Sequence, residues 1–467
     1  MYKKIKFEHR IVMIGFGTVG QATIPLLFNH LDIQPHQIQI ITKDDPGNAI
    51  VERYGISLIL NVITKENYLE VLAANLKPKD VLLNLSVGIS SVELIKYCQQ
   101  NEVLYLDLCT EPWAGFYDNE NLAPKQRTNY ALREAVLKLK NGPSTTALVT
   151  HGANPGLVSH FVKQALINIA KDSGQELHAP TSSQEWASLA KSLNIKAIHI
   201  AENDTQNILR YRQAQEFINT WSVGGFIGEG LQPAELGWGT HERHWPEDAE
   251  GYDYGEKCSI YLNRPGASVK VRTWTPSRGP FHGFLITHSE AISIADYLSY
   301  KENNRVIYRP TVHYAYQPCP LARLSLLELA GNEWQIQSKH QIIIDEIVDG
   351  SDELGVLLMG HQRGAYWFGS TLSIQEVRKI ADYNNATTLQ VVAGTIAGLL
   401  WVIEHPKAGL VEPEDIDFQY VLTIAKDYLG QLSGHYTDWT PLTNRERLFT
   451  EEVDHSDPWQ FKNIRVT

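Results

Sequence analysis

Short apolar runs alternate with helical patterns along the first third of the chain. The apolar runs cover residues 11–14, 38–42, 81–85, 103–108 and 147–150. Each is short enough to be a buried strand, and helical segments separate them. This is typical of a parallel sheet with crossover helices. The pattern therefore predicts an α/β domain over residues 1–155.

Near residue 155 the pattern changes to a long amphipathic helix. One helical face carries Val158, Phe161, Val162, Ala165, Leu166 and Ile169. Asn154 would be a good N-cap for this helix, and Pro155 would suit its first helical position.

Later stretches predict antiparallel strands. "CSIYLNRPGASVKVRTWTP" consists of two runs joined by a Pro-Gly turn, and "EWQIQSKHQIIIDEI" alternates. Helical patterns return from about residue 371. We therefore expect a second, mixed α+β domain over residues 156–370, which carries substrate and dimer contacts. A C-terminal helical segment, residues 371–467, should pack back on the first domain and complete it.

The first apolar run leads directly into a glycine-rich turn, "GFGTVG". A strand before such a turn and a helix after it form the context of a Rossmann dinucleotide site. Gly15 permits the tight turn, Gly17 lets the backbone approach a pyrophosphate, and Gly20 lets the helix pack on the strand. Thr18 and Val19 complete the turn, and the helix N-terminus offers N–H groups to an anion.

Further cofactor contacts are expected where the next strands end. Asp44 or Asp45 in "IITKDDPG" could take the ribose hydroxyls, although both lie further from the glycines than the usual spacing of about 20 residues. No Arg follows directly, which favours NAD over NADP. Asn84 and Ser86, in "LLNLSVG", would lie at the carboxyl end of a strand, where open α/β sheets bind ligands.

The same reasoning adds four residues that follow the last two predicted strands of the first domain. They are Thr110, Gly152, Ala153 and Asn154.

Composition narrows the class of protein. The chain has 467 residues, too many for one ordinary core, so two or more domains are expected. Its net charge of -12 argues against a nucleic-acid partner and is compatible with a cationic substrate. None of the four Cys forms a CxxC pair, so no metal site or redox pair is predicted, and a reducing compartment is favoured.

No segment predicts secretion or a membrane span. The N-terminus, "MYKKIKFEHR", has no apolar signal region. Residues 384–403 are uncharged and about membrane length, but their first third is polar, which favours a buried helix. Gly394 and Gly398 would let another helix approach it closely. We therefore expect a cytoplasmic protein.

One stretch gathers aromatic and acidic residues without any Lys or Arg. It is "NTWSVGGFIGEGLQPAELGWGTHE", residues 219–242, and it has no regular periodicity. Trp faces attract ammonium groups and carboxylates anchor them, so Trp221 and Glu229, together with Glu235 and Trp238, suggest a cage for an organic cation. The alternative is that these Trp fill a core.

Four further residues come from loops that follow apolar runs. Glu111 lies in "DLCTEPWAGFY", Asn154 in "THGANPGLVSH", Glu202 in "HIAENDTQ" and His288 in "GFLITHSEAISIADYL". A neutral His could shuttle protons near pH 7. Taken singly, each could be only a loop residue or a helix cap. No serine elbow, HExxH pair or P-loop supports a hydrolase or a nucleotide-triphosphate enzyme.

The motifs "HGANPGLVSHFVKQAL", "NTWSV", "EGLQPAELGWGTHE", "THSEAISIADYL" and "RPTVHYAYQPC" resemble those of the bacterial-type homospermidine synthases. That family is related to saccharopine dehydrogenase and carboxynorspermidine dehydrogenase, and the resemblance covers nearly the whole chain. It implies a transferase that joins two putrescine molecules through imine intermediates and releases ammonia, with NAD as a recycled cofactor. Spermidine could also be an aminobutyl donor, and the family forms homodimers.

The resemblance also implies roles for the acidic and aromatic residues. Trp221 would hold the bound amine or its iminium by a cation–π contact. Glu229 and Glu111 would bind distal ammonium groups. Glu202, Asn154 and His288 would orient the reacting nitrogen and manage its protons.

Two other interpretations stay open at the level of sequence. The first is a carboxynorspermidine- or saccharopine-type dehydrogenase with net redox turnover. Its carboxylate substrates would need basic residues, of which Arg210, Arg212 and Arg243 are near in sequence. The second is a sensor that binds NAD and polyamines without turnover.

Overall fold

The computed structural model describes residues 4–44, 47–117, 119, 121–140, 142, 144–175 and 179–466. The chain forms two compact units, and each unit is built from three segments. Unit 1 consists of Met1–Asn121, Ala131–Leu157 and Gln375–Leu429, and unit 2 of Leu122–Tyr130, Val158–Ile374 and Gly430–Thr467.

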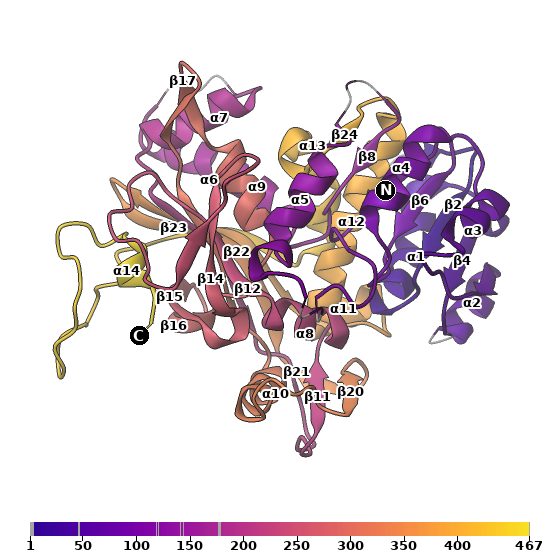
Figure 1. Ribbon diagram of the computed structural model, residues 1–467. Coiled ribbons are helices and arrows are strands. Elements are labelled where there is room, and N and C mark those ends of the chain that lie inside the picture. Colours follow the sequence, from indigo (N-terminus) through magenta and orange to yellow (C-terminus); the bar gives the residue numbers. More distant parts are fainter. Residues whose placement is uncertain are drawn as a thin grey trace. The chain divides into compact units, whose positions relative to one another are not determined.

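Unit 1 is built on a seven-stranded, all-parallel sheet (Figure 1). The strands, in sheet order, are β24 (Leu410–Val411), β8 (Ala147–Leu148), β7 (Leu104–Asp107), β6 (Val81–Asn84), β2 (Ile11–Ile14), β4 (Ile38–Thr42) and β5 (Ser57–Leu60). The five predicted strands are all present. The sheet also contains β5 and β24, which the apolar pattern did not predict; β24 has only two residues and comes from the C-terminal third of the chain.

The strand order places a topological switch at β2. From β2 the chain proceeds to β4 and β5 on one side, and then to β6, β7 and β8 on the other. Ile14 at the end of β2 pairs with Ile41 of β4 and with Asn84 of β6, so these three strands end level. Ligands of open α/β sheets bind at such a switch, beyond the carboxyl ends of the strands.

Helices connect and cover these strands. They are α1 (Thr18–His30), α2 (Asn48–Tyr54), α3 (Tyr68–Asn75), α4 (Ser91–Gln100), α5 (Asn129–Leu137), α11 (Ile374–Ile380), α12 (Ala386–Glu404) and α13 (Phe418–Ala425). The short parallel pair β1 (Ile5–Lys6) and β3 (Leu31–Asp32) lies outside the main sheet. Helix α12 packs against α1, and residues 375–429, which include α12 and α13, belong to unit 1.

Helix α12 is the predicted uncharged segment. Among the described residues it is the one helix long and apolar enough to pass a test for a membrane span, but 89% of its apolar window is buried inside the protein. The expected core helix is confirmed. Its small residues serve a different neighbour from the one predicted, because a Cβ on Gly394 would lie 2.0 Å from Gly152 O and one on Gly398 would lie 2.6 Å from His151 Nδ1. The loop after β8, and not another helix, makes this close approach.

Unit 2 is built on a ten-stranded mixed sheet (Figure 1). Its strands are β9 (Ala197–Asp204), β12 (Pro233–Gly237), β13 (Ala249–Gly251), β14 (Ser259–Pro265), β15 (Lys270–Thr275), β16 (Gly279–Phe284), β19 (Thr311–Gln317), β22 (Ser351–His361), β23 (Gly364–Ser373) and β25 (Gln431–Thr437). Strand β9 lies inside the sheet between β19, which is parallel to it, and β22, which is antiparallel. The Rossmann-type domain with a second mixed domain confirms the predicted fold class.

Smaller elements complete unit 2. The strands are β10 (Asn207–Ile208), β11 (Glu216–Asn219), β17 (Tyr300–Glu302), β18 (Arg305–Tyr308), β20 (Lys339–Ile342) and β21 (Ile347–Asp349). The helices are α6 (Leu157–Asp172), α7 (Ser183–Ser192), α8 (Val223–Leu231), α9 (Ser289–Tyr297), α10 (Pro320–Gly331) and α14 (Phe461–Ile464).

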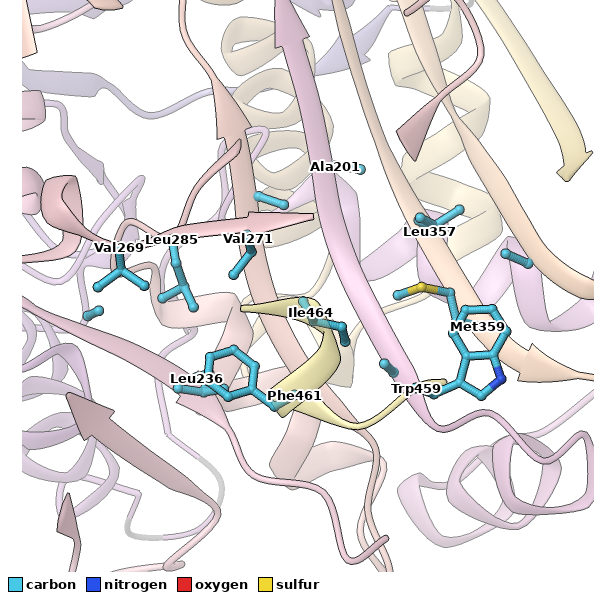
Figure 2. Packing of buried hydrophobic residues seen from close by; sticks show 14 of the residues in the cluster. Ala201, Leu236, Val269, Val271, Leu285, Leu357, Met359, Trp459, Phe461 and Ile464 are labelled. Atoms are coloured by element: carbon cyan, nitrogen blue, oxygen red, sulfur yellow. The ribbon is translucent and has the colours of Figure 1, made fainter. Parts of the chain in front are cut away.

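A hydrophobic cluster on one face of the large sheet includes the C-terminal helix. Figure 2 shows Phe461 and Ile464 of α14 among Leu236 of β12, Val271 of β15 and Leu357 of β22, all buried. Burial of such side chains contributes about 1.5–3 kcal/mol each. The end of the chain is therefore part of the core of unit 2.

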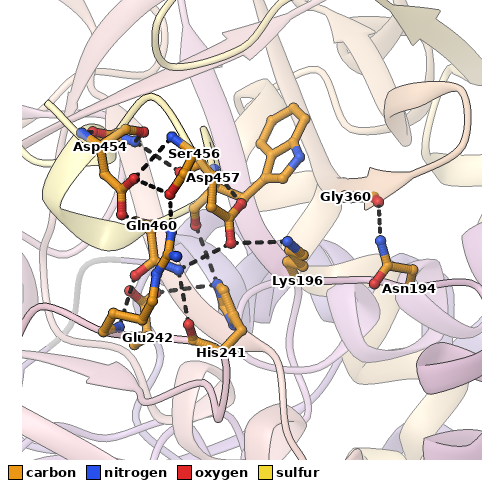
Figure 3. Close-up of polar contacts among 12 residues, drawn as sticks. Asn194, Lys196, His241, Glu242, Gly360, Asp454, Ser456, Asp457 and Gln460 are labelled. Atoms are coloured by element: carbon orange, nitrogen blue, oxygen red, sulfur yellow. Dashed lines mark hydrogen bonds and ion pairs between the residues drawn. The ribbon is translucent and has the colours of Figure 1, made fainter.

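Polar contacts hold the same segment (Figure 3). Asp457 forms an ion pair with Lys196 at 2.9 Å. The Gln460 side chain donates to His241 O at 2.8 Å, and the Phe461 N–H donates to Glu242 Oε2 at 2.9 Å. The predicted return of all of residues 371–467 to the first domain is therefore wrong. Residues 430–467 belong to unit 2, because β25 pairs with β23 and α14 is buried.

Three local predictions also differ from the structure. The runs around the Pro-Gly turn are β14 and β15, but they do not pair with each other: β14 pairs with β12 and β13, and β15 pairs with β16. The alternating stretch near residue 340 forms β20, which is parallel, not antiparallel, to β11. Asn154 is not the N-cap of α6, since that helix begins at Leu157, whose N–H donates to Gly152 O.

Candidate active site

The glycine-rich turn of unit 1 has the backbone that the motif requires. Gly15 has φ +87°, and a Cβ there would lie 2.9 Å from Leu85 O in the loop after β6. A Cβ on Gly20 would lie 3.2 Å from Met13 Sδ and from Gly15 O, a tight contact, so glycine favours the close approach of α1 to β2. Beside Gly17 no described atom lies within 4 Å of an added Cβ. The turn therefore presents open space at its centre and tight packing on both sides.

Helix α1 directs its N-terminus into this space. It begins at Thr18, followed by Val19, and has no acidic residue in its first turn. Asn384 Nδ2 donates to Thr18 O at 3.0 Å, which fixes the start of the helix from the loop before α12. Free N–H groups and a positive helix end suit a phosphate, so these residues fit the pyrophosphate of a dinucleotide.

The other predicted cofactor residues of the N-terminal half lie at the same sheet edge. Asp44 is exposed just beyond β4, with its Oδ1 3.5 Å from Thr42 Oγ1, while Asp45 lies outside the described residues. Asn84 ends β6 and accepts hydrogen bonds from Ser86 N at 3.2 Å and Ser86 Oγ at 2.6 Å. The long spacing to Asp44 arises because β3 and a short 3-10 turn precede β4.

The loops after β7 and β8 are ordered by buried polar contacts. Glu111 is buried, and its Oε2 accepts from Gly88 N at 3.2 Å; Thr110, beside it, is also buried. Asp107, at the end of β7, accepts from Thr150 N at 2.6 Å, and burial raises its pKa to about 6. The contact joins the two loops at their bases.

The loop after β8 carries three of the predicted residues. Gly152 N donates to Pro155 O at 2.8 Å, which closes a tight loop around Ala153 and Asn154. Ala153 is buried and Asn154 is half-buried. The structure thus brings all described cofactor candidates, with Glu111 and Asn154, to the carboxyl edge of the unit 1 sheet.

The remaining site candidates belong to unit 2, where contacts connect them. Glu229 of α8 lies with Oε2 2.9 Å from Nε2 of His288, and His288 Nδ1 lies 3.1 Å from Oε1 of Glu290. The hydroxyl of Tyr314 on β19 donates to Oε2 of Glu202 on β9 at 2.6 Å. The Tyr314 ring lies 4.3 Å from the His288 ring. Tyr314 therefore connects Glu202 to the group formed by His288, Glu229 and Glu290.

Trp221 is connected to the same cluster through aromatic contacts. Its Nε1 lies 3.4 Å from the Tyr316 hydroxyl, and its ring centroid lies 5.2 Å from that of Phe226. The Tyr316 ring stacks on Tyr314 at 5.1 Å. Tyr314 and Tyr316 share a face of β19 because strand side chains alternate, and Tyr316 is directly opposite Glu202.

The electrostatics of this cluster favour a charged His288. Burial lowers the pKa of His288, but the charges of Glu229 and Glu290 outweigh it and raise that pKa well above its usual value of 6.5. Burial, reinforced by the charge of Glu202, raises the pKa of Tyr314 well above 10. At neutral pH the cluster therefore has an imidazolium between two carboxylates and neutral Tyr hydroxyls.

The stretch 219–242 is more regular than its composition indicates. It forms the end of β11, then α8, then β12, although its sequence has no regular periodicity. Glu235 is fully buried and accepts from Asn129 N, Tyr252 and Thr287 at 2.7–2.8 Å, which caps the start of α5. Trp238 packs in the hydrophobic cluster of Figure 2. Of the four cage candidates in this stretch, Trp221 and Glu229 join the cluster around His288, and Glu235 and Trp238 do not.

The three arginines near this stretch bind carboxylates outside the cluster. Arg210 pairs with Glu216 at 2.6 Å, and Arg243 with Asp454 at 2.7 Å. Arg212 pairs with Glu328. Their charges are thus matched, which disfavours a pocket built for a substrate carboxylate.

Comparison with known proteins agrees with the two-unit layout. The family models of the saccharopine dehydrogenase NADP binding domain and the saccharopine dehydrogenase C-terminal domain match residues 11–147 and 152–438. Homospermidine synthase from Blastochloris viridis is 49% identical, over 99% of this chain and 98% of its own length. That from Mesorhizobium japonicum is 46% identical, over 98% and 96%. The chain belongs to the homospermidine synthase family.

A solved structure supports the same family. The homospermidine synthase from Legionella pneumophila, crystallised in complex with NAD, has a TM-score of 0.94 and 56% identity. The match covers 100% of this chain and 99% of that chain. The predicted family and the predicted transferase class are confirmed, and the dehydrogenase and sensor alternatives have no further support.

For a homospermidine synthase, the sequence analysis missed three residues of the unit 2 cluster: Tyr314, Tyr316 and Glu290. Each lies within a motif that carried the family resemblance, "RPTVHYAYQPC" or "THSEAISIADYL". The Tyr-x-Tyr spacing was a usable signal, since it puts both rings on one strand face. Glu290 had no signal of its own, because a Glu in the first turn of a helix is ordinary.

Proposed function

We propose that this homospermidine synthase joins two putrescine molecules into homospermidine and releases ammonia. NAD, when bound, would supply the oxidation of the first amine and the later reduction of the Schiff base, so no net redox change occurs. The observation that carries the proposal is the connected cluster of Glu202, Tyr314, His288 and Glu229 beside the Trp221 ring. Such a cluster suits an organic ammonium ion, because carboxylates and aromatic faces both attract cations.

We propose separate roles for the residues of this cluster. The Trp221 face would hold the ammonium or iminium centre, with about 0.5–2 kcal/mol from the cation–π contact. Glu229 would bind the distal ammonium group. Glu202 and His288 would orient the reacting nitrogen and exchange its protons, because an amine must be neutral before it can be oxidised or can attack an imine.

Two residues of unit 1 complete the proposed roles. Glu111 would bind a second distal ammonium group, and Asn154 would orient the reacting nitrogen. Their support is the family resemblance, together with their place at the sheet edge where Gly15 and Gly17 fit the pyrophosphate. The proposal for NAD is supported by this fit and by the NAD complex of the L. pneumophila relative.

Incubation of the purified protein with putrescine and NAD tests this function. Homospermidine is followed by mass, ammonia by a coupled assay and NADH by absorbance. We expect equal amounts of homospermidine and ammonia with little NADH. Stoichiometric NADH without homospermidine would instead mean an ordinary amine dehydrogenase. A parallel incubation with spermidine establishes whether it is also an aminobutyl donor.

We infer that the enzyme works as a homodimer, as the resemblance implies, and in the cytoplasm, as its sparse cysteine usage favours. Light scattering after size-exclusion chromatography should give twice the chain mass of 52.7 kDa. A mass near 52.7 kDa at assay concentrations would contradict the dimer.

A further inference from the structure

Glu290 lies behind His288, on the side away from Glu229. The side chain of Glu290 is 1% exposed, whereas that of Glu229 is 19% exposed. The two carboxylates bind opposite nitrogens of one imidazole, at 3.1 and 2.9 Å. Glu229 is therefore the acid that an amine can reach, whereas the Glu290 carboxylate, among the described residues, hydrogen-bonds to His288 alone.

The geometry of α9 holds Glu290 in this place. His288 is the N-cap residue of α9 with an extended backbone, φ -145° and ψ 140°, and Glu290 lies in the first turn. A carboxylate is favoured at a helix N-terminus by the helix dipole. The ring of Tyr314 lies 4.3 Å from the imidazole and restricts its rotation.

The protonation state of the imidazole follows from its two partners. A neutral imidazole has one N–H and could donate to only one of the carboxylates, which would leave its other nitrogen facing an anion. Both contacts are satisfied only if both nitrogens carry protons. The second oxygen of Glu290, Oε2, is buried and has no hydrogen-bond partner among the described residues. Glu290 is therefore held mainly through His288.

We propose that Glu290 is a positioning residue of the reaction: it holds His288 doubly protonated with Nε2–H directed at Glu229. When Glu229 takes a proton from the substrate ammonium group, the imidazolium beside it loses one of its two anions. Glu290 then keeps the charge of His288 in place, so that Glu229 can return the proton later in the cycle. This inference rests on the roles proposed for Glu229 and His288.

The test is Glu290→Gln, which keeps the size of the side chain and removes its charge. We expect kcat for putrescine to fall about tenfold with KM changed less than about twofold, because Glu290 does not touch the amine. Removal of an anion lowers the pKa of an imidazolium, so the alkaline limb of the pH–kcat profile should move to lower pH. Glu290→Asp should restore part of the rate. The groups that face His288 are Glu229 from α8, Glu290 from α9 and Tyr314 from β19.

Glu235→Gln is the matched control, since Glu235 is equally buried but caps α5. It should lower the melting temperature and leave the pH profile in place. The proposal is overturned if Glu290→Gln lowers kcat without moving the profile, or if it raises KM alone.

A second measurement does not depend on turnover. NMR of ¹⁵N-histidine-labelled protein, with His288 assigned by its loss in His288→Asn, reports the charge of the ring directly. We expect His288 to remain doubly protonated above pH 7.5 in the wild type. Titration of the His288 ring near its usual pKa of 6.5 in the wild type would overturn the proposal, even if Glu290→Gln failed to fold. If His288 titrates near pH 6.5 in a protein that makes homospermidine, the role of Glu290 is refuted and the proposed function stands. If His288 stays charged but no homospermidine forms, the proposed function is refuted and the effect of Glu290 on His288 stands.

Discussion

The Tyr314 hydroxyl donates a 2.6 Å hydrogen bond to Glu202 Oε2 between two neighbouring parallel strands. The same Tyr314 places its ring 4.3 Å from the imidazole of His288. One side chain thus joins a buried acid to the charged imidazole, through its hydroxyl on one side and its ring on the other. The two contributions can be tested separately.

Tyr314→Phe removes the hydroxyl and keeps the ring. We expect turnover to fall about tenfold, because a hydrogen bond to a charged acceptor contributes about 1.5–3 kcal/mol and holds Glu202 in place. The fold should persist, since stacking on Tyr316 and His288 remains. Steady-state kinetics with putrescine and thermal unfolding measure the two effects.

Tyr308→Phe is its control, because the Tyr308 hydroxyl donates to Ile195 O at 2.8 Å, outside the cluster. It should lower stability slightly and leave kcat unchanged. Equal losses of turnover in both variants would refute a role for Tyr314 in the site.

Trp221→Ala should impair turnover much more than folding. Trp221 is only half-buried, so its loss leaves little cavity, but the proposed cation–π contact disappears. Trp221→Phe should retain more activity than Trp221→Ala, since a smaller aromatic face remains. As a comparison, Trp367→Ala removes a fully buried ring and should lower the free energy of unfolding by about 3–5 kcal/mol. Full activity in Trp221→Ala would rule out the cage.

The fold of unit 1 could be predicted because its information is local. The runs at β2 and β4 have the bounds observed: β2 is wholly apolar and buried, and β4 departs from this only at Gln39 and Thr42, as expected for strands covered on both faces. The glycine turn adds a motif with its own steric requirement. The partner of β25 could not be predicted in this way, because a seven-residue strand near the C-terminus does not specify β23, whose paired residues lie 62 to 72 positions earlier.

The site could be predicted only in part, for a related reason. Trp221, Glu229 and His288 stood out as unusual residue types in loops, and the structure connects them. Glu235 has the same sequence setting as Glu229, yet it is a buried cap of α5. The sequence could not distinguish the two acids, because it does not show that the Asn129 N–H donates to Glu235. The contact of Glu229 with His288 spans 59 residues and that of Glu235 with Asn129 spans 106, and such tertiary contacts decide which acid joins the proposed site and which serves the fold.

Gly17→Ala and Gly15→Ala should separate cofactor binding from folding. A Cβ on Gly17 meets no described atom within 4 Å, so Gly17→Ala should fold normally. It should still weaken NAD binding at least about tenfold, because the methyl group occupies the approach of the pyrophosphate.

Gly15→Ala should lower the melting temperature, since φ is +87° and the Cβ would lie 2.9 Å from Leu85 O. Differential scanning fluorimetry with and without NAD measures both, and an unchanged NAD affinity in Gly17→Ala would contradict the assignment of the turn.

Glu242 makes the stability of unit 2 depend on pH. It accepts from Thr311 Oγ1 at 2.5 Å and from Phe461 N at 2.9 Å, and burial raises its pKa to about 7 (Figure 3). In the unfolded chain the pKa is near 4.5. The folded state therefore binds more protons between these two values, and the free energy of unfolding falls as pH rises from about 4.5 to about 7. The loss is on the order of 3 kcal/mol at about 1.4 kcal/mol per pH unit.

Glu242→Gln should remove this loss. Its amide oxygen can accept from Phe461 N as Glu242 Oε2 does, and its NH2 group can donate to Thr311 Oγ1 in place of the bond that the carboxyl accepts from that hydroxyl, but it cannot ionise. We expect the variant to be more stable than the wild type at pH 8 and nearly equal to it at pH 5, in urea unfolding followed by tryptophan fluorescence. The difference between the two proteins cancels the titration of other groups, including nearby His241 and Asp457. Glu452→Gln, at a side chain that is 95% exposed, is the control and should follow the wild type at both pH values. A Glu242→Gln variant less stable than the wild type at pH 8 would mean that the ionised carboxylate stabilises the attachment of α14.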